Sequence, residues 1–293
     1  MKYQSLSRVI SYFASTINKE NTLSLEQIKK IILTGFGSYQ NEGILLIEGF
    51  EYDKNFIINS FDNPKIQENL YYHNLIWERK GLLDFLERDI LDIKIANKEW
   101  IALHLDNGFV EFVSPFFALS FNKVMKFVLN EPIFASALQL NSLNVFLVID
   151  DFEIAYRPVQ SFLEENITFF RNLSFEIYIT ESVVEKWASQ NFAVFFNSLP
   201  IFFSEPLDKL AFELVNFTIS IQRENPRWFR LFYADIIQLE NIDPDSKTII
   251  LRQNQLFERN ENRKNLNSQL NYWIKIAIIL IYFFLVYWLA LSI

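Results

Sequence analysis

The sequence contains no cysteine, which excludes disulfide bonds, thiolate nucleophiles and cysteine-bound metal. Histidine is also scarce: His73 and His104 stand alone, without the spacing of a metal site or a catalytic triad. Glycine and proline number only 6 and 8, and 51% of the residues are hydrophobic. This composition argues against intrinsic disorder, so we expect a folded chain.

Acidic residues outnumber basic ones, with 35 Asp and Glu against 27 Lys and Arg. The net charge is −8 at pH 7, and no basic patch is evident. Nucleic-acid binding relies on such a patch, so we expect no nucleic-acid partner. Aromatic residues are abundant at 17%, with 31 phenylalanines, and they must fill cores or partner surfaces.

The last residues, 272–293, form the clearest feature of the chain. From Ile274 onward the segment is apolar apart from Lys275, and at about 1.5 Å per residue it reaches roughly 30 Å, the thickness of a bilayer core. We therefore predict a single C-terminal transmembrane helix, with membrane lipid as a partner. The residues expected to anchor it at the interfaces are Trp273, Lys275, Tyr287 and Trp288. A C-terminal helix buried inside a large assembly is the alternative.

The charges beside this segment predict its orientation. Arg259, Arg263 and Lys264 precede it and nothing basic follows it, so the positive-inside rule places the bulk of the chain in the cytoplasm. Residues 1–5 lead into an amphipathic pattern and not into the apolar core of an export signal. The expected localisation is a single-pass membrane protein with a C-terminal anchor.

The rest of the chain predicts an α+β or α/β fold. The expected divisions are a helix-rich region at 1–95, a mixed α/β domain at 96–255, a polar tether at 256–271 and the transmembrane helix at 272–293. Strands separated by helices favour β-α-β-α-β units in the second division.

Local sequence patterns predict the helices and strands of residues 1–95. Apolar residues at helical spacing predict helices near 6–17 and 66–77, the second opened by Pro64. A capping box of Ser24 and Gln27 begins a helix that Gly35 is placed to end. Two short apolar runs, at 44–47 and 56–58, predict strands.

Beyond residue 96 we expect mainly strands, with helices at 120–130 and from Pro158 to about 170. An Asn107-Gly108 pair predicts a hairpin joining strands at 100–105 and 109–113. Further strands are expected at 144–149, 175–180, 192–196, 215–221 and 248–251. A short helix is expected at 181–189, and residues 228–237 fit either state.

Acidic residues follow one of these predicted strands. Asp150 and Asp151 end the run that starts at Val148, and Glu153 comes just after. Paired acids at the carboxyl edge of a sheet can hold Mg²⁺ or a nucleotide's metal, so these three are the candidate metal ligands. The alternative is that they cap the turn that follows a strand.

The run Val148-Ile149-Asp150-Asp151 resembles the first strand and acidic pair of response-regulator receiver domains, over residues 144–196. Asn197, and no phosphorylatable Asp, follows the third strand, so the resemblance implies a degenerate, unphosphorylated receiver-like domain. The run also resembles the acidic strand of P-loop proteins, but the chain has no Gly-x-x-x-x-Gly-Lys-Ser/Thr stretch to bind phosphate.

Pairs of phenylalanines stand beside Pro115 and Pro200. These candidate protein-docking residues are Phe116, Phe117, Phe202 and Phe203. Packing in the core is the competing interpretation.

Together these features predict a membrane-anchored cytoplasmic adaptor or scaffold. It would be a non-catalytic component of a membrane-associated multiprotein assembly, of which a secretion apparatus is one example, with other proteins as partners and no cofactor. The alternative is a Mg²⁺-dependent or nucleotide-binding switch or enzyme that uses Asp150, Asp151 and Glu153.

Overall fold

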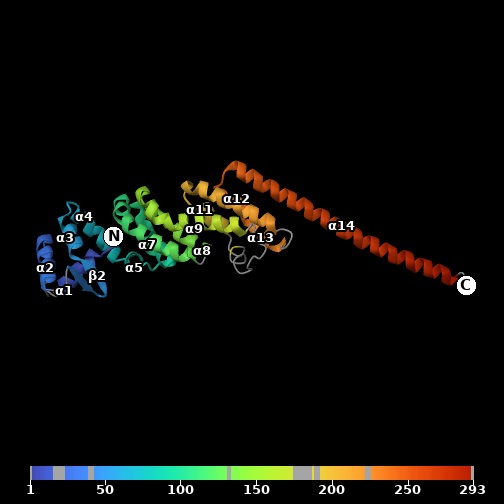
Figure 1. The fold of residues 1–293 in the computed structure, drawn as a ribbon. Helices are drawn as coiled ribbons and strands as arrows, with labels where there is room; N and C mark the ends of the chain where they lie inside the picture. The colour runs from blue at the N-terminus through green and yellow to red at the C-terminus, as the bar shows by residue number, and fades with distance from the viewer. Residues whose placement is uncertain are drawn as a thin grey trace. The chain divides into compact units, whose positions relative to one another are not determined.

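The computed structural model describes residues 2–15, 24–38, 43–130, 133–173, 187, 192–221 and 226–291. The chain divides into two compact units, Met1–Glu165 and Asn166–Ile293, with the division inside helix α9 (Phe152–Leu173). Within the described residues the only sheet is a two-stranded hairpin, and helices supply nearly everything else (Figure 1).

The predicted mixed sheet is therefore wrong. Most of the segments expected as strands beyond residue 96 are helical in the structure, and residues 175–180 and 181–189 lie outside the description apart from the helical Trp187. The strand expected at 56–58 is also helical, inside α3 (Lys54–Asp62). The strand and acidic pair that resembled a receiver domain become the 3₁₀ turn Ile149–Asp151, and its third strand becomes α11 (Phe192–Ser198).

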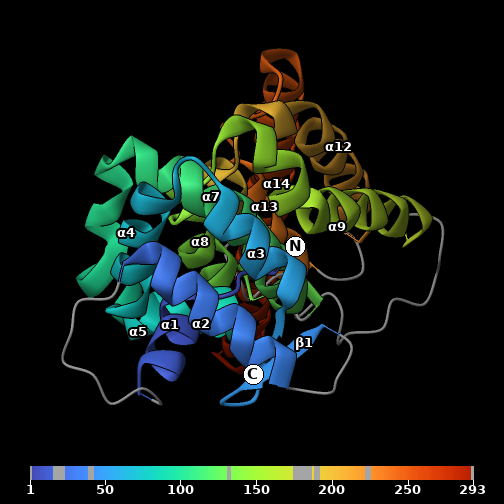
Figure 2. The same ribbon diagram turned by 90° about the vertical axis from the view of Figure 1, so that its left-hand side faces the viewer.

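The first unit opens with helices packed around the hairpin. Helices α1 (Leu6–Ser15), α2 (Leu25–Ser38) and α3 share a core with strands β1 (Ile44–Ile47) and β2 (Phe50–Asp53) (Figure 2). The strands are antiparallel, with Leu45 opposite Tyr52. Glu48 and Gly49 join them in a two-residue turn with φ of 51° and 84°, the left-handed backbone that tight hairpins require.

A long central helix, α7 (Asn107–Asn130), organises the rest of this unit. The elements around it are α4 (Ile66–Trp77), α5 (Lys80–Arg88), α6 (Ile93–Ile95), a π-helical turn at Ala96–Trp100, 3₁₀ turns at Ile101–Leu105 and Asn144–Phe146, and α8 (Phe134–Asn141). Buried aromatic rings fill the space between them. The ring of Phe117 lies 4.8 Å from that of Phe85 and 5.3 Å from that of Phe146.

The second unit is helical throughout its described residues. It contains the end of α9, then α11, the 3₁₀ turn Ile201–Phe203, α12 (Ser204–Ile221), α13 (Pro226–Ile236) and α14 (Pro244–Leu291). Its core is again aromatic: the Phe170 ring lies 5.0 Å from Trp187 and 5.3 Å from Phe217.

The structure does not identify the C-terminal segment as the apolar helix of the fold, so this part of the predicted fold class is wrong. Among the described residues the one helix long and apolar enough to cross a membrane is the internal α7, and half of its apolar window is buried inside the protein. Burial of that kind is typical of the core helix of a globular unit. The predicted segment continues α14, and its side chains from 279 onward lie outside the description.

Candidate functional site

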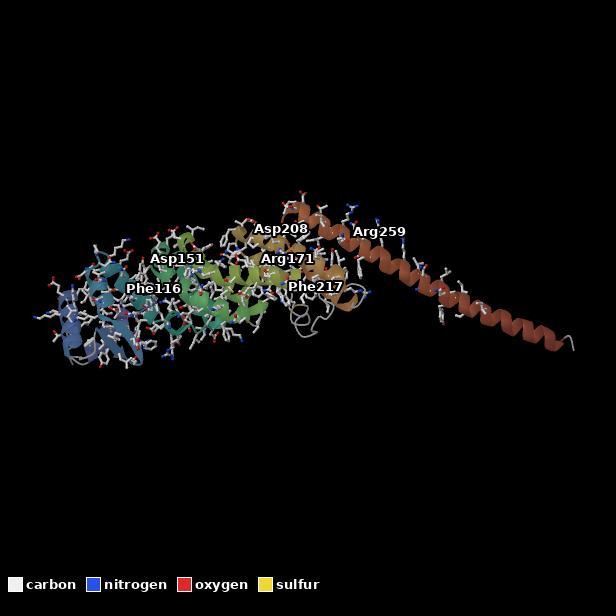
Figure 3. All side chains as sticks on the ribbon, viewed as in Figure 1. Phe116, Asp151, Arg171, Asp208, Phe217 and Arg259 are labelled. Atoms are coloured by element: carbon white, nitrogen blue, oxygen red, sulfur yellow. The ribbon has the colours of Figure 1, made fainter. Side chains whose placement is uncertain are left out.

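Of the acidic residues singled out from the sequence, Asp150 and Asp151 lie in the 3₁₀ turn Ile149–Asp151 and Glu153 lies in the first turn of α9. The predicted sheet edge is therefore not formed by the described residues at this position. Asp151, which Figure 3 labels, accepts a 2.6 Å hydrogen bond at Oδ2 from the hydroxyl of Ser114 in α7. The Ser114 hydroxyl oxygen accepts a hydrogen bond of 2.8 Å from the Val148 amide. Asp151 is thus held in a structural contact. No group of three or more His, Asp or Glu side chains is arranged to hold a metal in the described parts of the chain.

The phenylalanines proposed for docking fall in different environments. Phe117 and Phe203 are buried in the cores of their units. Phe116 is half-buried, and the centre of its ring lies 5.3 Å from that of Tyr3 in a T-shaped contact. Phe202 is 50% exposed, beside Ile201 at 74%. The pair Ile201 and Phe202 is therefore exposed and apolar, and we call it the apolar tip.

The proposed anchor residues lie on α14. Trp273 is 64% exposed, whereas the side chains of Lys275, Tyr287 and Trp288 lie outside the described residues. The early part of α14 packs within its own unit: the Tyr233 hydroxyl donates to the Ile250 carbonyl at 2.7 Å, and Phe257 is buried against Phe229. Phe257 is the last buried residue that the structure describes in this helix.

Sequence reasoning missed a buried polar cluster in the first unit. Arg8 of α1 reaches Glu87 of α5 at 2.6 Å and Glu48 of the hairpin turn at 3.0 Å. Its guanidinium carbon also lies 4.0 Å from the centre of the Phe50 ring, a cation–π contact. Residues far apart in the chain meet here, and no spacing within one segment could have indicated it.

Burial controls protonation around this cluster. It raises the pKa of Glu87 to about 7, even though the Arg8 guanidinium works in the opposite direction. Burial lowers the pKa of His73 to about 3, and its Nδ1 lies 2.7 Å from the Tyr3 hydroxyl. His73 is therefore a neutral core imidazole at physiological pH and is not poised as an acid or base.

Comparison with known protein families, with curated proteins and with solved structures finds no match to this chain. The functional argument therefore rests on the residues themselves.

Proposed function

We propose that this protein is a membrane-anchored adaptor. In this proposal the C-terminal end of α14 is embedded in lipid, the remainder of the chain lies in the cytoplasm, and exposed apolar surface on the folded units binds partner proteins. The observation that carries the proposal is the exposed apolar band on α14.

The band consists of Tyr272, Trp273, Ile274 and Ile278, and it lies beyond Phe257, the last buried residue that the structure describes in α14. Tyr272 is 62% exposed, Trp273 64% and Ile278 60%, and none of them finds a partner surface that would bury it. Large apolar side chains left in water are costly, at about 25 cal/mol per Å² of surface. Aromatic rings followed by aliphatic residues match the order of a membrane interface and its hydrocarbon core.

Charge along α14 supports the orientation. Arg259 and Arg263 precede the band and are exposed. Basic residues on this side favour retention of the preceding chain in the cytoplasm.

The adaptor role is supported by the apolar tip, Ile201 and Phe202. Aromatic residues, phenylalanine among them, are enriched in interfaces between proteins, so an exposed phenylalanine beside an exposed isoleucine is suited to such a contact. The acidic residues Asp150 and Asp151 favour no second function, because the described residues form a 3₁₀ turn at this position and not the sheet edge on which a metal or nucleotide site depended.

Flotation on a density gradient tests the anchoring. The full chain should float with liposomes and resist alkaline carbonate extraction, and a chain truncated after Asn271 should remain at the bottom of the gradient. Equal flotation of the two chains, or a full chain that stays soluble without detergent, contradicts the proposal.

Affinity capture from detergent extracts tests the docking tip. Ile201→Asp with Phe202→Asp should release partners that the wild type retains. Phe127→Asp is the matched control, because Phe127 is an exposed phenylalanine, at 77%, that belongs to the other unit. Loss of the same partners from the control, or their retention by the tip variant, argues against docking at this position.

A further inference from the structure

The hairpin of the first unit is a sheet of only two strands among the described residues, so each strand has an outer edge. A strand edge carries a row of backbone N–H and C=O groups that can pair with a further strand. Antiparallel pairing alternates, so every second residue of a strand directs these groups away from its partner strand. The Lys54 amide donates to the Gly43 carbonyl at 2.8 Å across the hairpin. Counted in steps of two from Gly43, the residues of β1 whose backbone groups point outward are therefore Ile44 and Leu46.

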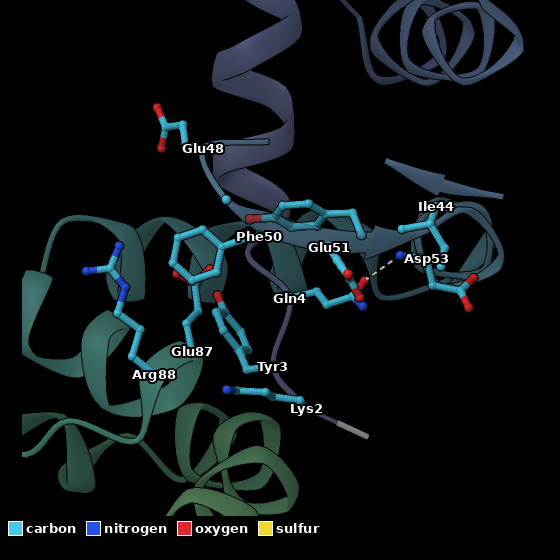
Figure 4. A pocket seen from close by; sticks show the side chains of 12 residues that line it. Lys2, Tyr3, Gln4, Ile44, Glu48, Phe50, Glu51, Asp53, Glu87 and Arg88 are labelled. Carbon is cyan, nitrogen blue, oxygen red and sulfur yellow. Dashed lines mark hydrogen bonds between the residues drawn. The ribbon is translucent and has the colours of Figure 1, made fainter. Parts of the chain in front are cut away.

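The edge of β2 is protected against a further strand. The outward amide of Asp53 donates to Oε1 of Gln4 at 3.2 Å, the hydrogen bond drawn as a dashed line in Figure 4. Residues 2–4 line the pocket beside this strand, so the N-terminal segment lies along the same edge. Glu51 and Asp53 are also exposed carboxylates, and charge on an edge strand opposes pairing with another chain.

The edge of β1 differs in each respect. The strand Ile44–Ile47 consists of four aliphatic residues, without a charge or a proline. No other described residue forms a hydrogen bond with the outward backbone groups of Ile44 or Leu46. Their side chains are 49% and 62% exposed, on the face of the hairpin that turns away from its core. The backbone and the side chains of this edge therefore both lack a partner among the described residues.

We propose that the partner is a second copy of this chain, whose β1 pairs antiparallel with the first about a two-fold axis at Leu45. In this register Ile44 of one copy lies opposite Leu46 of the other. The outward N–H and C=O groups of each such pair exchange hydrogen bonds, and the exposed aliphatic side chains meet on one face of the joined sheet.

The chemistry of the edge favours a second copy over a strand of another protein. The edge is complementary to itself, because both residues that point outward are aliphatic and each becomes the neighbour of the other. Pairing about a two-fold axis uses the open edge of each copy, so the assembly closes as a dimer with β2 on the outside. The carboxylates of the β2 strands are then separated by three strand spacings, about 14 Å, which exceeds the Debye length of about 8 Å at physiological salt. Their repulsion is therefore largely screened.

Disulfide cross-linking tests the register, because the chain contains no cysteine of its own. Ile44→Cys and Leu46→Cys are prepared as separate full-length proteins in detergent micelles. Their mixture should form a cross-linked dimer with a mild oxidant, because opposed residues have Cα atoms about 5.5 Å apart. Either protein alone should cross-link much less, because the same residue in the two copies is diagonal, at about 7–8 Å. No cross-link in the mixture, or equal cross-linking of the mixture and the single proteins, overturns the proposal.

Sedimentation of the full chain in micelles measures the association itself. Leu46→Lys sets a charge against Ile44 of the other copy, so it should raise the dissociation constant of the dimer at least about tenfold. Glu51→Lys is the matched control, because it places the same side chain on the same exposed face, directly opposite Leu46 but on the protected strand. It should leave the dissociation constant unchanged, and circular dichroism should show both variants folded.

A wild type that remains monomeric, or that joins a strand of another protein and not its own copy, overturns the proposal. A dimer that Leu46→Lys leaves intact overturns it as well, because such a dimer is held elsewhere, for example through α14. Neither measurement depends on membrane anchoring, so a failure here leaves the proposed function standing.

Discussion

Arg8 and Glu87 form a buried ion pair across 79 positions of the chain: Nη2 of Arg8 lies 2.6 Å from Oε2 of Glu87. Their side chains are 8% and 2% exposed. The pair joins α1 to α5, and Arg8 also reaches Glu48 in the turn of the hairpin at 3.0 Å. Arg8 therefore connects three segments of the first unit.

Removing Arg8 should strongly destabilise the first unit. Arg8→Ala leaves Glu87 buried without its counter-charge, and the expected loss is about 3–5 kcal/mol in the free energy of unfolding. Lys29→Ala is the control, because the Lys29–Asp62 pair lies nearer the surface and should cost about 1 kcal/mol or less. Urea unfolding followed by tryptophan fluorescence measures both. Equal losses would mean that the Arg8 pair is no stronger than a surface contact.

The stability of the protein should depend on the ionisation of Glu87. Burial raises its pKa to about 7 in the folded protein, from about 4.5 when unfolded, so the folded state holds the proton more tightly. This contribution to stability is fully present below pH 4.5 and is lost as the pH rises through about 7. Between pH 5.5 and pH 8, the melting temperature of the wild type should therefore fall more than that of Glu87→Gln. A parallel fall in the two proteins contradicts the assignment.

Gly35 should be intolerant of a methyl group. A Cβ at this position would overlap the ring of Phe13, so Gly35→Ala should lower the free energy of unfolding by about 1–3 kcal/mol. In an uncrowded helix the same change would raise the free energy of unfolding by up to about 1 kcal/mol. The sign of the measured change therefore shows whether Phe13 crowds this position. The double variant Gly35→Ala with Phe13→Leu should recover part of the loss in thermal unfolding. Simple additivity of the two changes would contradict the predicted clash.

Ser114 should matter for stability and not for metal binding. Ser114→Ala removes the hydrogen bond to Asp151 and leaves the Val148 amide without its acceptor, at a cost of about 1–3 kcal/mol. Ser142→Ala, which removes an exposed hydroxyl, should change stability by only about 0.5 kcal/mol. Thermal unfolding with and without Mg²⁺ tests whether the protein binds the metal, and we expect the same melting temperature in both conditions. A rise in melting temperature with Mg²⁺ that Asp150→Asn abolishes would restore the metal interpretation.

The sequence predicted local helical features well where a full apolar stripe or a cap was present. The capping box is confirmed: the Ser24 amide donates to Gln27 Oε1 at 2.9 Å, and the Gln27 amide donates to Ser24 Oγ at 3.3 Å. The strand at Ile44–Ile47 is confirmed as β1. The predicted end of the second helix at Gly35 is wrong, because α2 continues to Ser38 and Gly35 makes room for Phe13.

Most of the strand predictions were wrong because short apolar runs do not distinguish a strand from a helix. The Asn107-Gly108 pair begins α7 and does not turn a hairpin, because Asp106 caps the helix by accepting from the Phe109 amide at 3.1 Å. Val215 and Phe217 alternate with polar residues, yet Leu214 and Thr218 are buried with them on the inner face of α12. The buried cluster of Arg8, Glu48 and Glu87 could not be predicted, because its residues come from three segments that meet only after folding.

The contact of α14 with lipid is the claim on which the proposed function depends, and the absence of cysteine makes it directly measurable. A polarity-sensitive dye on Ile278→Cys should shift to the blue in liposomes and be quenched by spin-labelled acyl chains. The same dye on Arg252→Cys, an exposed position of α14 before the band, should do neither. Equal, water-like emission from both positions in the presence of liposomes would contradict membrane anchoring through α14.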